Sequence, residues 1–168
     1  MEKEPKTGLF RDVEFDGHGN SMYRRPLCYE LAGKTFQLVM DTGNDYLIHF
    51  VSGEKLMWAE LGHEFRWEHY DCVKVDDETY FVNGELSDTP YRYGITLVLD
   101  MEQSLVTMAV ANQGHNPRLK DMISTHFYFG AIKIDGQPLP TKRHGFTSEL
   151  KGKRIHWRYN PNFAITHV

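Results

Sequence analysis

Charged side chains recur at every second position of the stretch His63–Tyr70, which reads HEFRWEHY. In an extended strand alternate side chains point to opposite faces, so Glu64, Arg66 and Glu68 share one face with Tyr70. That face is either a ladder of surface charges or the polar lining of an interior. In an interior, an arginine can hold a ligand anion through two parallel hydrogen bonds or keep a carboxylate ionised. Arg66 is therefore a candidate binding residue.

A second candidate for chemistry is Glu85, in the segment TYFVNGEL. If this segment lines a barrel lumen, the carboxyl group of Glu85 is withdrawn from water among Phe36, Tyr46 and Phe81. A desolvated carboxyl group can exchange its proton near neutral pH and act as a general acid or base. Decarboxylation, dehydration or isomerisation of an aromatic substrate needs little more than this group and an orienting arginine, with no nucleophile.

Aromatic and apolar residues supply the expected walls of the site. Tyr91 and Tyr93 share a face of YRYGITLVL with Ile95 and Leu97, either as core residues or with hydroxyl groups that orient a polar ligand. The predicted ligand-contacting residues are Phe36, Leu38, Met40, Phe81, Tyr91 and Tyr93.

Metal and cofactor motifs are missing from the sequence. The nine histidines fall at both strand parities, without HxH or HExxH spacing, and there is no glycine-rich phosphate loop. Cys28 and Cys72 lack CxxC spacing, so we interpret them as reduced thiols of a cytoplasmic protein. We expect no metal and no other cofactor.

Composition limits the class of partner. A chain of 168 residues with 40% hydrophobic residues is most simply one domain with a substantial core. The net charge of -4 gives no electrostatic footprint for nucleic acid, and no run approaches the roughly 20 apolar residues of a membrane helix. The charged start of the chain does not resemble a signal peptide. The expected partner is a small molecule.

Short segments of period two, separated by turn residues, run from about Lys34 to Ile134. Eight such strands in sequence predict an all-β fold, an antiparallel up-and-down barrel of the calycin or lipocalin-like kind, with a β-sandwich as the alternative. Eight strands leave room for one small ligand. We expect an extension over residues 1–30, a barrel over residues 31–144, and a separate hairpin over residues 145–168.

That last hairpin repeats the first one. LKGKRIHWRYNPNFAITHV follows the pattern of LAGKTFQLVMDTGNDYLIHFV, with Leu150 opposite Leu31 and Gly152 opposite Gly33. Because an isolated hairpin is marginal in water, its two strands should pair with a sheet. They would complete the barrel, or pair across a subunit contact in a homodimer. A third reading is that the chain is one module of a larger assembly.

Several of these segments together resemble the MoaF family: LAGKTFQLVMDTGNDYLIHF, LMWAE, EHYDCVKVDDETYFV, ITLVLDMEQSLVTM and RHGFTSELKGKRIHWRYNPNFAITHV. Members of that family are similar to two linked calycin-type halves. The resemblance covers most of the chain from Leu31 onward. The resemblance implies a barrel, followed by the first hairpin of a second calycin-type half.

A more distant resemblance, to phenolic acid decarboxylases, implies roles for single residues. Their pocket arginine falls on Arg66, their acid/base glutamate on Glu85, and a tyrosine of the second strand on Tyr46. The two tyrosines that hold the substrate carboxylate in those enzymes fall on Leu38 and Met40, which cannot do so. The resemblance therefore implies a similar pocket without decarboxylation of hydroxycinnamic acids.

These observations predict a small-molecule enzyme of the lyase or isomerase type, acting on an aromatic or amine-derived metabolite. Glu85 would be the general acid or base, Arg66 would orient the substrate, and Tyr46 would donate a hydrogen bond. The alternative is a carrier or sensor that uses the same barrel without chemistry. A glutamate and an arginine inside the barrel favour the enzyme, whereas an all-apolar interior favours the carrier.

Overall fold

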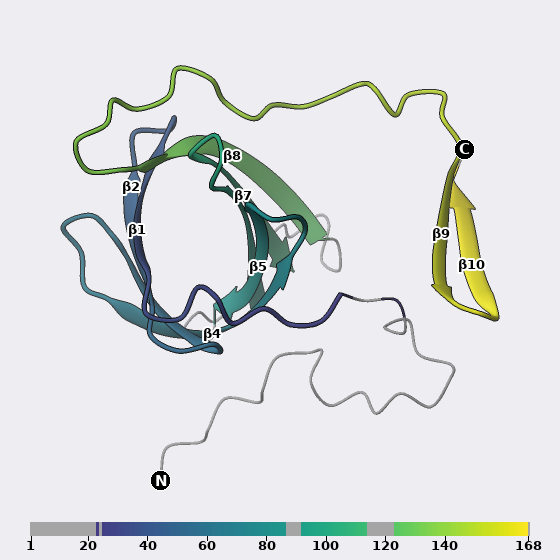
Figure 1. Ribbon diagram of the computed structural model, residues 1–168, viewed down its shortest axis with the longest axis horizontal. Helices are drawn as coiled ribbons and strands as arrows, with labels where there is room; N and C mark the ends of the chain where they lie inside the picture. The colour runs from purple at the N-terminus through teal and green to yellow at the C-terminus, as the bar shows by residue number, and fades with distance from the viewer. Residues whose placement is uncertain (1–22, 24, 87–91, 114–122, 168) are drawn as a thin grey trace, which may run out of the picture.

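The computed structural model describes residue 23 and residues 25–86, 92–113 and 123–167. Its strands are β1 (Thr35–Met40), β2 (Asp45–Phe50), β3 (Lys55–Glu60), β4 (Arg66–Lys74), β5 (Thr79–Leu86), β6 (Arg92–Asp100), β7 (Leu105–Gln113), β8 (Ile123–Lys133), β9 (Ile155–Asn160) and β10 (Phe163–His167). Strands β1 to β8 each pair antiparallel with the next, and β1 also pairs with β8, so the sheet closes (Figure 1). The predicted all-β, up-and-down barrel is confirmed. In the described residues no helix is long and apolar enough to cross a membrane.

Alternate side chains of each strand fill the barrel. Leu38 and Met40 of β1 face inward and are almost fully buried, and so are Ile48 and Phe50 of β2. The Phe50 ring packs edge-on against Tyr70, with ring centroids 4.9 Å apart. The other large contributors are Leu56, Tyr80, Val82, Leu97, Leu99, Val106, Met108 and Ile132. This is the period-two alternation that the sequence carries.

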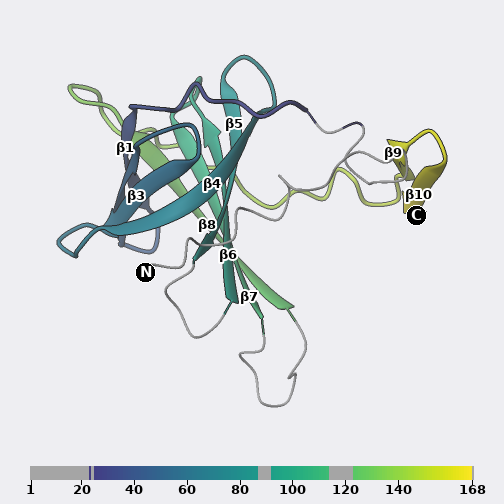
Figure 2. The ribbon, with the colours of Figure 1, turned by 90° about the horizontal axis from the view of Figure 1, so that it is seen from below.

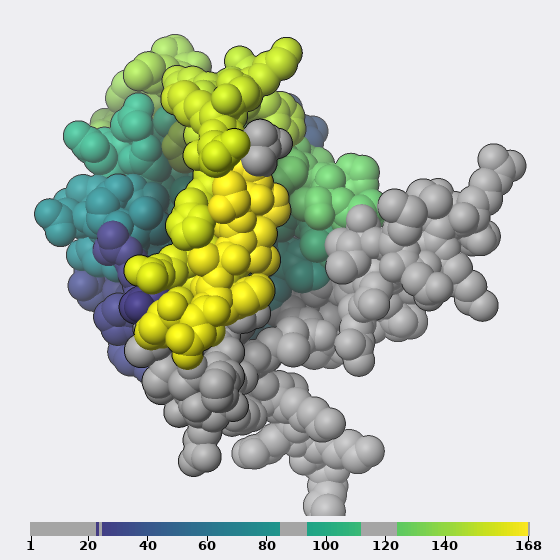
Figure 3. Space-filling view, turned by 90° about the vertical axis from the view of Figure 1, so that its right-hand side faces the viewer, coloured from purple at the N-terminus to yellow at the C-terminus, as the bar shows by residue number. Residues whose placement is uncertain are grey.

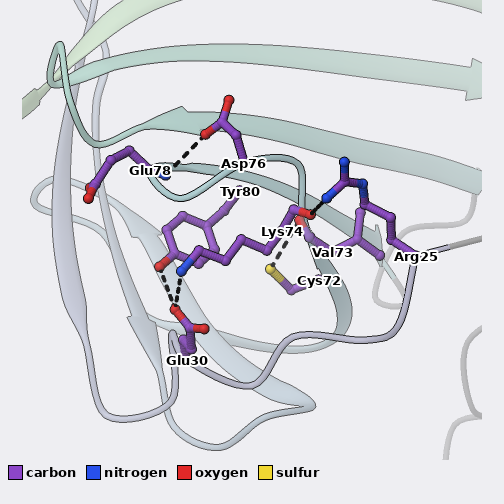
Figure 4. A network of polar contacts seen from close by, with 8 residues as sticks. All are labelled: Arg25, Glu30, Cys72, Val73, Lys74, Asp76, Glu78 and Tyr80. Carbon is purple, nitrogen blue, oxygen red and sulfur yellow. Dashed lines mark hydrogen bonds and ion pairs between the residues drawn. The ribbon is translucent and has the colours of Figure 1, made fainter.

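The segment before β1 belongs to the barrel. Leu31 is fully buried in the core, and Leu27 forms an isolated antiparallel bridge with Val73 of β4. Glu30 accepts hydrogen bonds from Lys74 Nζ, at 2.8 Å, and from the Tyr80 hydroxyl group, at 2.9 Å (Figure 4). These bonds hold the pKa of the Glu30 carboxyl group below its usual value, the bond from Lys74 having the larger effect. Residues 27–31 therefore pack against the barrel.

The two cysteines lie opposite each other where this segment joins β4. Cys28 donates its backbone N–H to the Cys72 carbonyl group at 2.8 Å, and both side chains are buried as free thiols. Burial, and secondarily the neighbouring Cys28, raises the pKa of the Cys72 thiol to about 12. Since only the thiolate is nucleophilic, Cys72 is inert at neutral pH.

The raised pKa of Cys72 also makes stability depend on pH. The folded protein holds the Cys72 proton more tightly than the unfolded chain, so the stabilisation is complete below the unfolded pKa of 9.0 and is lost as pH rises toward about 12. We expect urea midpoints to fall over this range less steeply in Cys72→Ala than in the parent. At pH 8, Ellman's reagent should leave Cys72 unmodified until the protein is unfolded. Rapid modification of the native protein would contradict the buried thiol.

After β8 the chain crosses the outside of the barrel as a strap of irregular backbone. Arg143 Nε binds Asp41 Oδ1 at 2.7 Å, and His144 Nδ1 lies 2.8 Å from the Thr107 hydroxyl group. Further along, Phe146 packs edge-on against Phe129, with ring centroids 5.4 Å apart. These contacts fix the strap to the barrel wall.

Strands β9 and β10 form a two-stranded sheet of their own. In Figures 1 and 2 this sheet stands apart from the barrel, which closes without it. Among the described strands β9 and β10 pair only with each other. The hairpin is thus formed, and its pairing with another subunit stays a prediction.

Candidate functional site

The charged face of β4 points into the barrel. Glu68 is 6% exposed and Tyr70 is 2% exposed, whereas Trp67, on the other face, is 57% exposed. Of the charged residues in HEFRWEHY, Glu68 is therefore inside the barrel, whereas Glu64 and Arg66 are exposed. The inner wall thus holds one buried carboxyl group, with an exposed guanidinium group two residues before it at the start of β4.

Arg66 begins β4, and its exposed side chain lies over the ring of Trp58. The two residues are directly opposite in the β3–β4 ladder, and the Arg66 guanidinium carbon lies 5.8 Å from the centre of the Trp58 ring. On the other side of Trp58 lies Tyr46, with ring centroids 6.1 Å apart. The structure thus brings together two predicted site residues, Arg66 and Tyr46, through an indole ring that joins them.

Trp58 carries an unused hydrogen-bond donor. Its Nε1 atom is buried and has no hydrogen-bond partner among the described residues. A buried donor left unpaired is destabilising by about 1–3 kcal/mol, which is why such groups are uncommon in folded proteins. A donor of this kind, beside a guanidinium group that is itself exposed, suits an oxygen-bearing ligand.

Tyr46 supplies a second donor at the same place. Burial raises the pKa of its hydroxyl group, and the nearby Glu60 and Tyr128 raise it further, against a hydrogen bond with Asn44 that lowers it. The hydroxyl group therefore keeps its proton at neutral pH and can donate a hydrogen bond. Register places Glu60 opposite Tyr46, so a carboxylate stands beside this donor.

The remaining predicted residues are divided between the two faces of the barrel wall. Phe36 packs edge-on against Phe50, and Leu38 and Met40 are buried in the core, so all three line the interior; their contact with a ligand stays a prediction. Phe81 is 37% exposed on the outer face, because its neighbours Tyr80 and Val82 are the ones that point inward.

For the three other predicted residues the structure does not describe the side chain. Glu85 lies in β5 with its backbone opposite Gly94, and Tyr93 lies in β6 opposite Leu86; their side chains are outside the described residues. Tyr91 lies wholly outside them.

The sequence contains a signal for Trp58 and Glu60. In KLMWAE, period two puts Leu56, Trp58 and Glu60 on one face, and a tight turn leads into HEFRWEHY. Fixing the register across that turn would have placed Trp58 opposite Arg66. Glu68 was on the predicted charged face, but sequence alone gave no reason to prefer it to Glu64.

The assembled site, which we call the inner polar site, consists of Tyr46, Trp58, Glu60, Arg66 and Glu68. It offers a cation, two neutral donors, two carboxyl groups and two aromatic faces, positioned by β2, β3 and β4. In the described part of the chain no three His, Cys, Asp or Glu side chains gather as they would around a metal ion. The chemistry that the inner polar site can supply is anion binding, ring stacking and proton transfer.

Comparison with known proteins identifies the family. The MoaF N-terminal domain matches residues 10–114, which is more than half of the chain. A Burkholderia vietnamiensis crystal structure, described provisionally as a beta-lactamase, is similar over 66% of this chain and 97% of its own, with 20% identity and a TM-score of 0.49. The search of curated proteins finds no match. On the strength of the domain match, the chain belongs to the MoaF family.

Proposed function

We propose that this protein binds a small aromatic molecule in the barrel interior at the inner polar site and transforms it as a lyase or isomerase, without a metal or other cofactor. The observation that carries the proposal is the inward face of β4, where the buried Glu68 follows Arg66 at two-residue spacing. Charged side chains are rarely buried, and buried carboxyl groups gather at functional sites, so the burial of Glu68, two residues after the exposed Arg66, favours chemistry over simple packing.

Each side chain has a role in this proposal. Arg66 binds an anionic group of the ligand through its planar guanidinium fork, and Trp58 and Tyr46 contact the ring. The Tyr46 hydroxyl group donates a hydrogen bond to a ligand oxygen. Glu68 removes a proton from the ligand and returns it to another atom, or to the leaving group, which is all that isomerisation or elimination needs.

Glu68 takes the place in the proposal that the resemblance to decarboxylases gave to Glu85. The reason is position: Glu68 is buried on the same inner face as Arg66. Glu85 remains the candidate that the resemblance implies, and substitution separates the two.

A carrier or sensor is the alternative, and the apolar part of the interior favours it. Leu38, Met40 and Ile48 offer a surface that can hold a hydrophobic ring without reacting with it. In a carrier Arg66 would still anchor the ligand, but Glu68 would have no proton to move.

Isothermal titration calorimetry tests the binding that both functions need. We expect the parent protein to bind aromatic carboxylates, such as 4-hydroxyphenylacetate, more tightly than the matching amine, tyramine. Arg66→Met keeps the length of the side chain but removes its charge, and should weaken carboxylate binding by about tenfold or more, since a charge-assisted hydrogen bond contributes about 1.5–3 kcal/mol.

The matched control is Lys55→Met, which removes a cation from the exposed start of β3, the strand that carries Trp58. This variant should bind like the parent. The proposal would be abandoned if aromatic ligands did not bind the parent, or if Arg66→Met and Lys55→Met bound them equally well.

A further inference from the structure

The hairpin β9–β10 reproduces the backbone of the first barrel hairpin. Lys34 donates its N–H to the Leu31 carbonyl group at 3.0 Å, and Lys153 does the same to Leu150 at 3.0 Å. The glycine inside each turn has a positive φ, 79° at Gly33 and 75° at Gly152. The repeat in the sequence is therefore a repeat in structure.

One face of this hairpin is made of core-type residues that the barrel does not cover. Trp157 is directly opposite Ile165 in the ladder, and Tyr159 stacks on Phe163 with ring centroids 5.5 Å apart. The repeat aligns Trp157 with Leu38, which is fully buried, yet Trp157 is 52% exposed. Phe163 and Ile165 are 42% and 37% exposed. We call this surface the hairpin face.

A two-stranded sheet with an open apolar face is marginal in water and is expected to bind another surface. In Figure 3 the hairpin lies at the surface with a broad side uncovered. The strap is fixed to the barrel wall as far as Phe146.

The hairpin segment is strongly basic and the remainder of the chain is acidic. Residues 150–168 contain four Lys or Arg and no Asp or Glu. Subtracting these four from the 19 Lys and Arg of the whole chain leaves 15 against 23 Asp and Glu, a net charge of -8 for residues 1–149. A basic segment of this kind is complementary to the acidic barrel of the same protein.

The barrel carries a matching acidic surface at one end. The β4–β5 turn holds Asp77 and Glu78, both exposed, and it is tied to the β6–β7 turn by a hydrogen bond from Met101 N to the Glu78 carbonyl group at 2.9 Å. Glu102 is exposed in that second turn, and Val75, beside the first, is 42% exposed. We call these neighbouring residues the acidic turns.

We propose that the hairpin face docks on the acidic turns of a second copy of this chain, with each copy giving its hairpin and receiving the other. The apolar face is covered by Val75 and the outer surface of β5, and Lys153 and Arg154, which precede β9, meet Asp77, Glu78 and Glu102. A reciprocal exchange of this kind closes as a two-fold dimer. It explains why a core-type hairpin is attached to a barrel that is already closed.

Sedimentation equilibrium of the full chain tests the proposal. The parent should be a dimer with a dissociation constant of about 10 μM or tighter. Trp157→Ser/Ile165→Ser should weaken the dimer by about tenfold or more, because aromatic anchors carry much of the energy of an interface. Higher salt should also weaken it, since ions screen the charge pairs.

Charge reversal identifies the docking surface. Two variants with reversed charge should each be monomeric: the hairpin variant, Lys153→Glu/Arg154→Glu, and the barrel variant, Asp77→Lys/Glu78→Lys/Glu102→Lys. Mixed in equal amounts they should form a heterodimer, because each hairpin then meets a barrel of opposite charge. Circular dichroism should confirm that both variants remain folded.

Three outcomes would overturn the proposal. The parent protein could stay monomeric up to about 100 μM, a concentration at which weak association would be detected. The hairpin face would then not bind a second copy of the chain. A barrel variant that dimerises like the parent shows that hairpins pair with each other instead. A serine variant that dimerises like the parent shows that the hairpin face is not the interface.

Discussion

Replacing Gly130 with alanine should lower the free energy of unfolding by about 3 kcal/mol, which is the upper part of the range for overpacked interiors. Gly130 lies in β8 at the seam where the barrel closes, paired with Met40 on one side and Val106 on the other. A Cβ atom at this position would lie 2.5 Å from the Val39 carbonyl oxygen and 2.8 Å from Met40 Sδ. The methionine side chain can move, but the carbonyl oxygen belongs to the adjoining strand. Relief therefore requires β1 and β8 to separate.

Gly94→Ala is the matched control for that substitution. Gly94 lies inside β6, and among the described side chains a Cβ atom there would meet Ala111 Cβ alone, at the ordinary distance of 3.9 Å. We expect Gly94→Ala to change stability little or to raise it slightly, because alanine has less backbone freedom to lose on folding. Urea unfolding followed by circular dichroism measures both. Equal midpoints for the two variants would show that the β1–β8 seam is not tightly closed.

The strands could be predicted because their signal is local. Period-two alternation and turn residues identified all eight barrel strands, and the DTGND turn has Gly43 at a positive φ of 87°, as a tight turn requires. The closure of the barrel, by contrast, has no local signal. It depends on Gly130 meeting Met40 across more than eighty residues of chain, and no short stretch of sequence records that contact.

The site was predictable in its parts and not in its assembly. Period two placed Arg66 and Glu68 on one face; the structure buries Glu68 inside the barrel and leaves Arg66 exposed at the start of the strand. The contact of Tyr46 and Arg66 with Trp58 depends on the registers of β2–β3 and β3–β4, which are set by turns. A one-residue slip in either ladder would turn Trp58 to the outside. Composition and alternation do not fix the register, so they could not predict that Trp58 contacts both Tyr46 and Arg66.

The hairpin shows a third limit. Its apolar alternation predicted strands, and strands formed. Its resemblance to the first hairpin suggested that it could complete the barrel, but the eight preceding strands leave no open edge in the sheet. A strand can join a sheet only where the sheet has an unpaired edge. Whether such an edge exists depends on the rest of the chain, and a repeat in sequence does not specify it.

The largest functional effect should follow from Glu68→Gln. On a ligand that calorimetry has identified and that the parent transforms, we expect kcat to fall by about 100-fold or more, the usual contribution of a general acid or base. The change is isosteric and removes only the exchangeable proton and the charge, so the dissociation constant of the ligand should stay within about threefold while turnover is lost. Glu68→Asp keeps the carboxyl group and should retain part of the activity.

Two further substitutions decide whether the loss belongs to Glu68. Glu64→Gln removes a carboxyl group from the same alternation but from an exposed position before β4, and should leave kcat near the parent value. Glu85→Gln tests the acid that the decarboxylase resemblance implies, and a loss confined to that variant would move the chemistry from β4 to β5. A parent protein that binds the ligand and returns it unchanged would support the carrier. In that case Glu68 stabilises the folded protein and takes no part in a reaction. Glu68→Gln should then change the urea midpoint but not ligand binding. The reason is that a buried carboxyl group with bonded neighbours contributes to stability whether or not it transfers a proton.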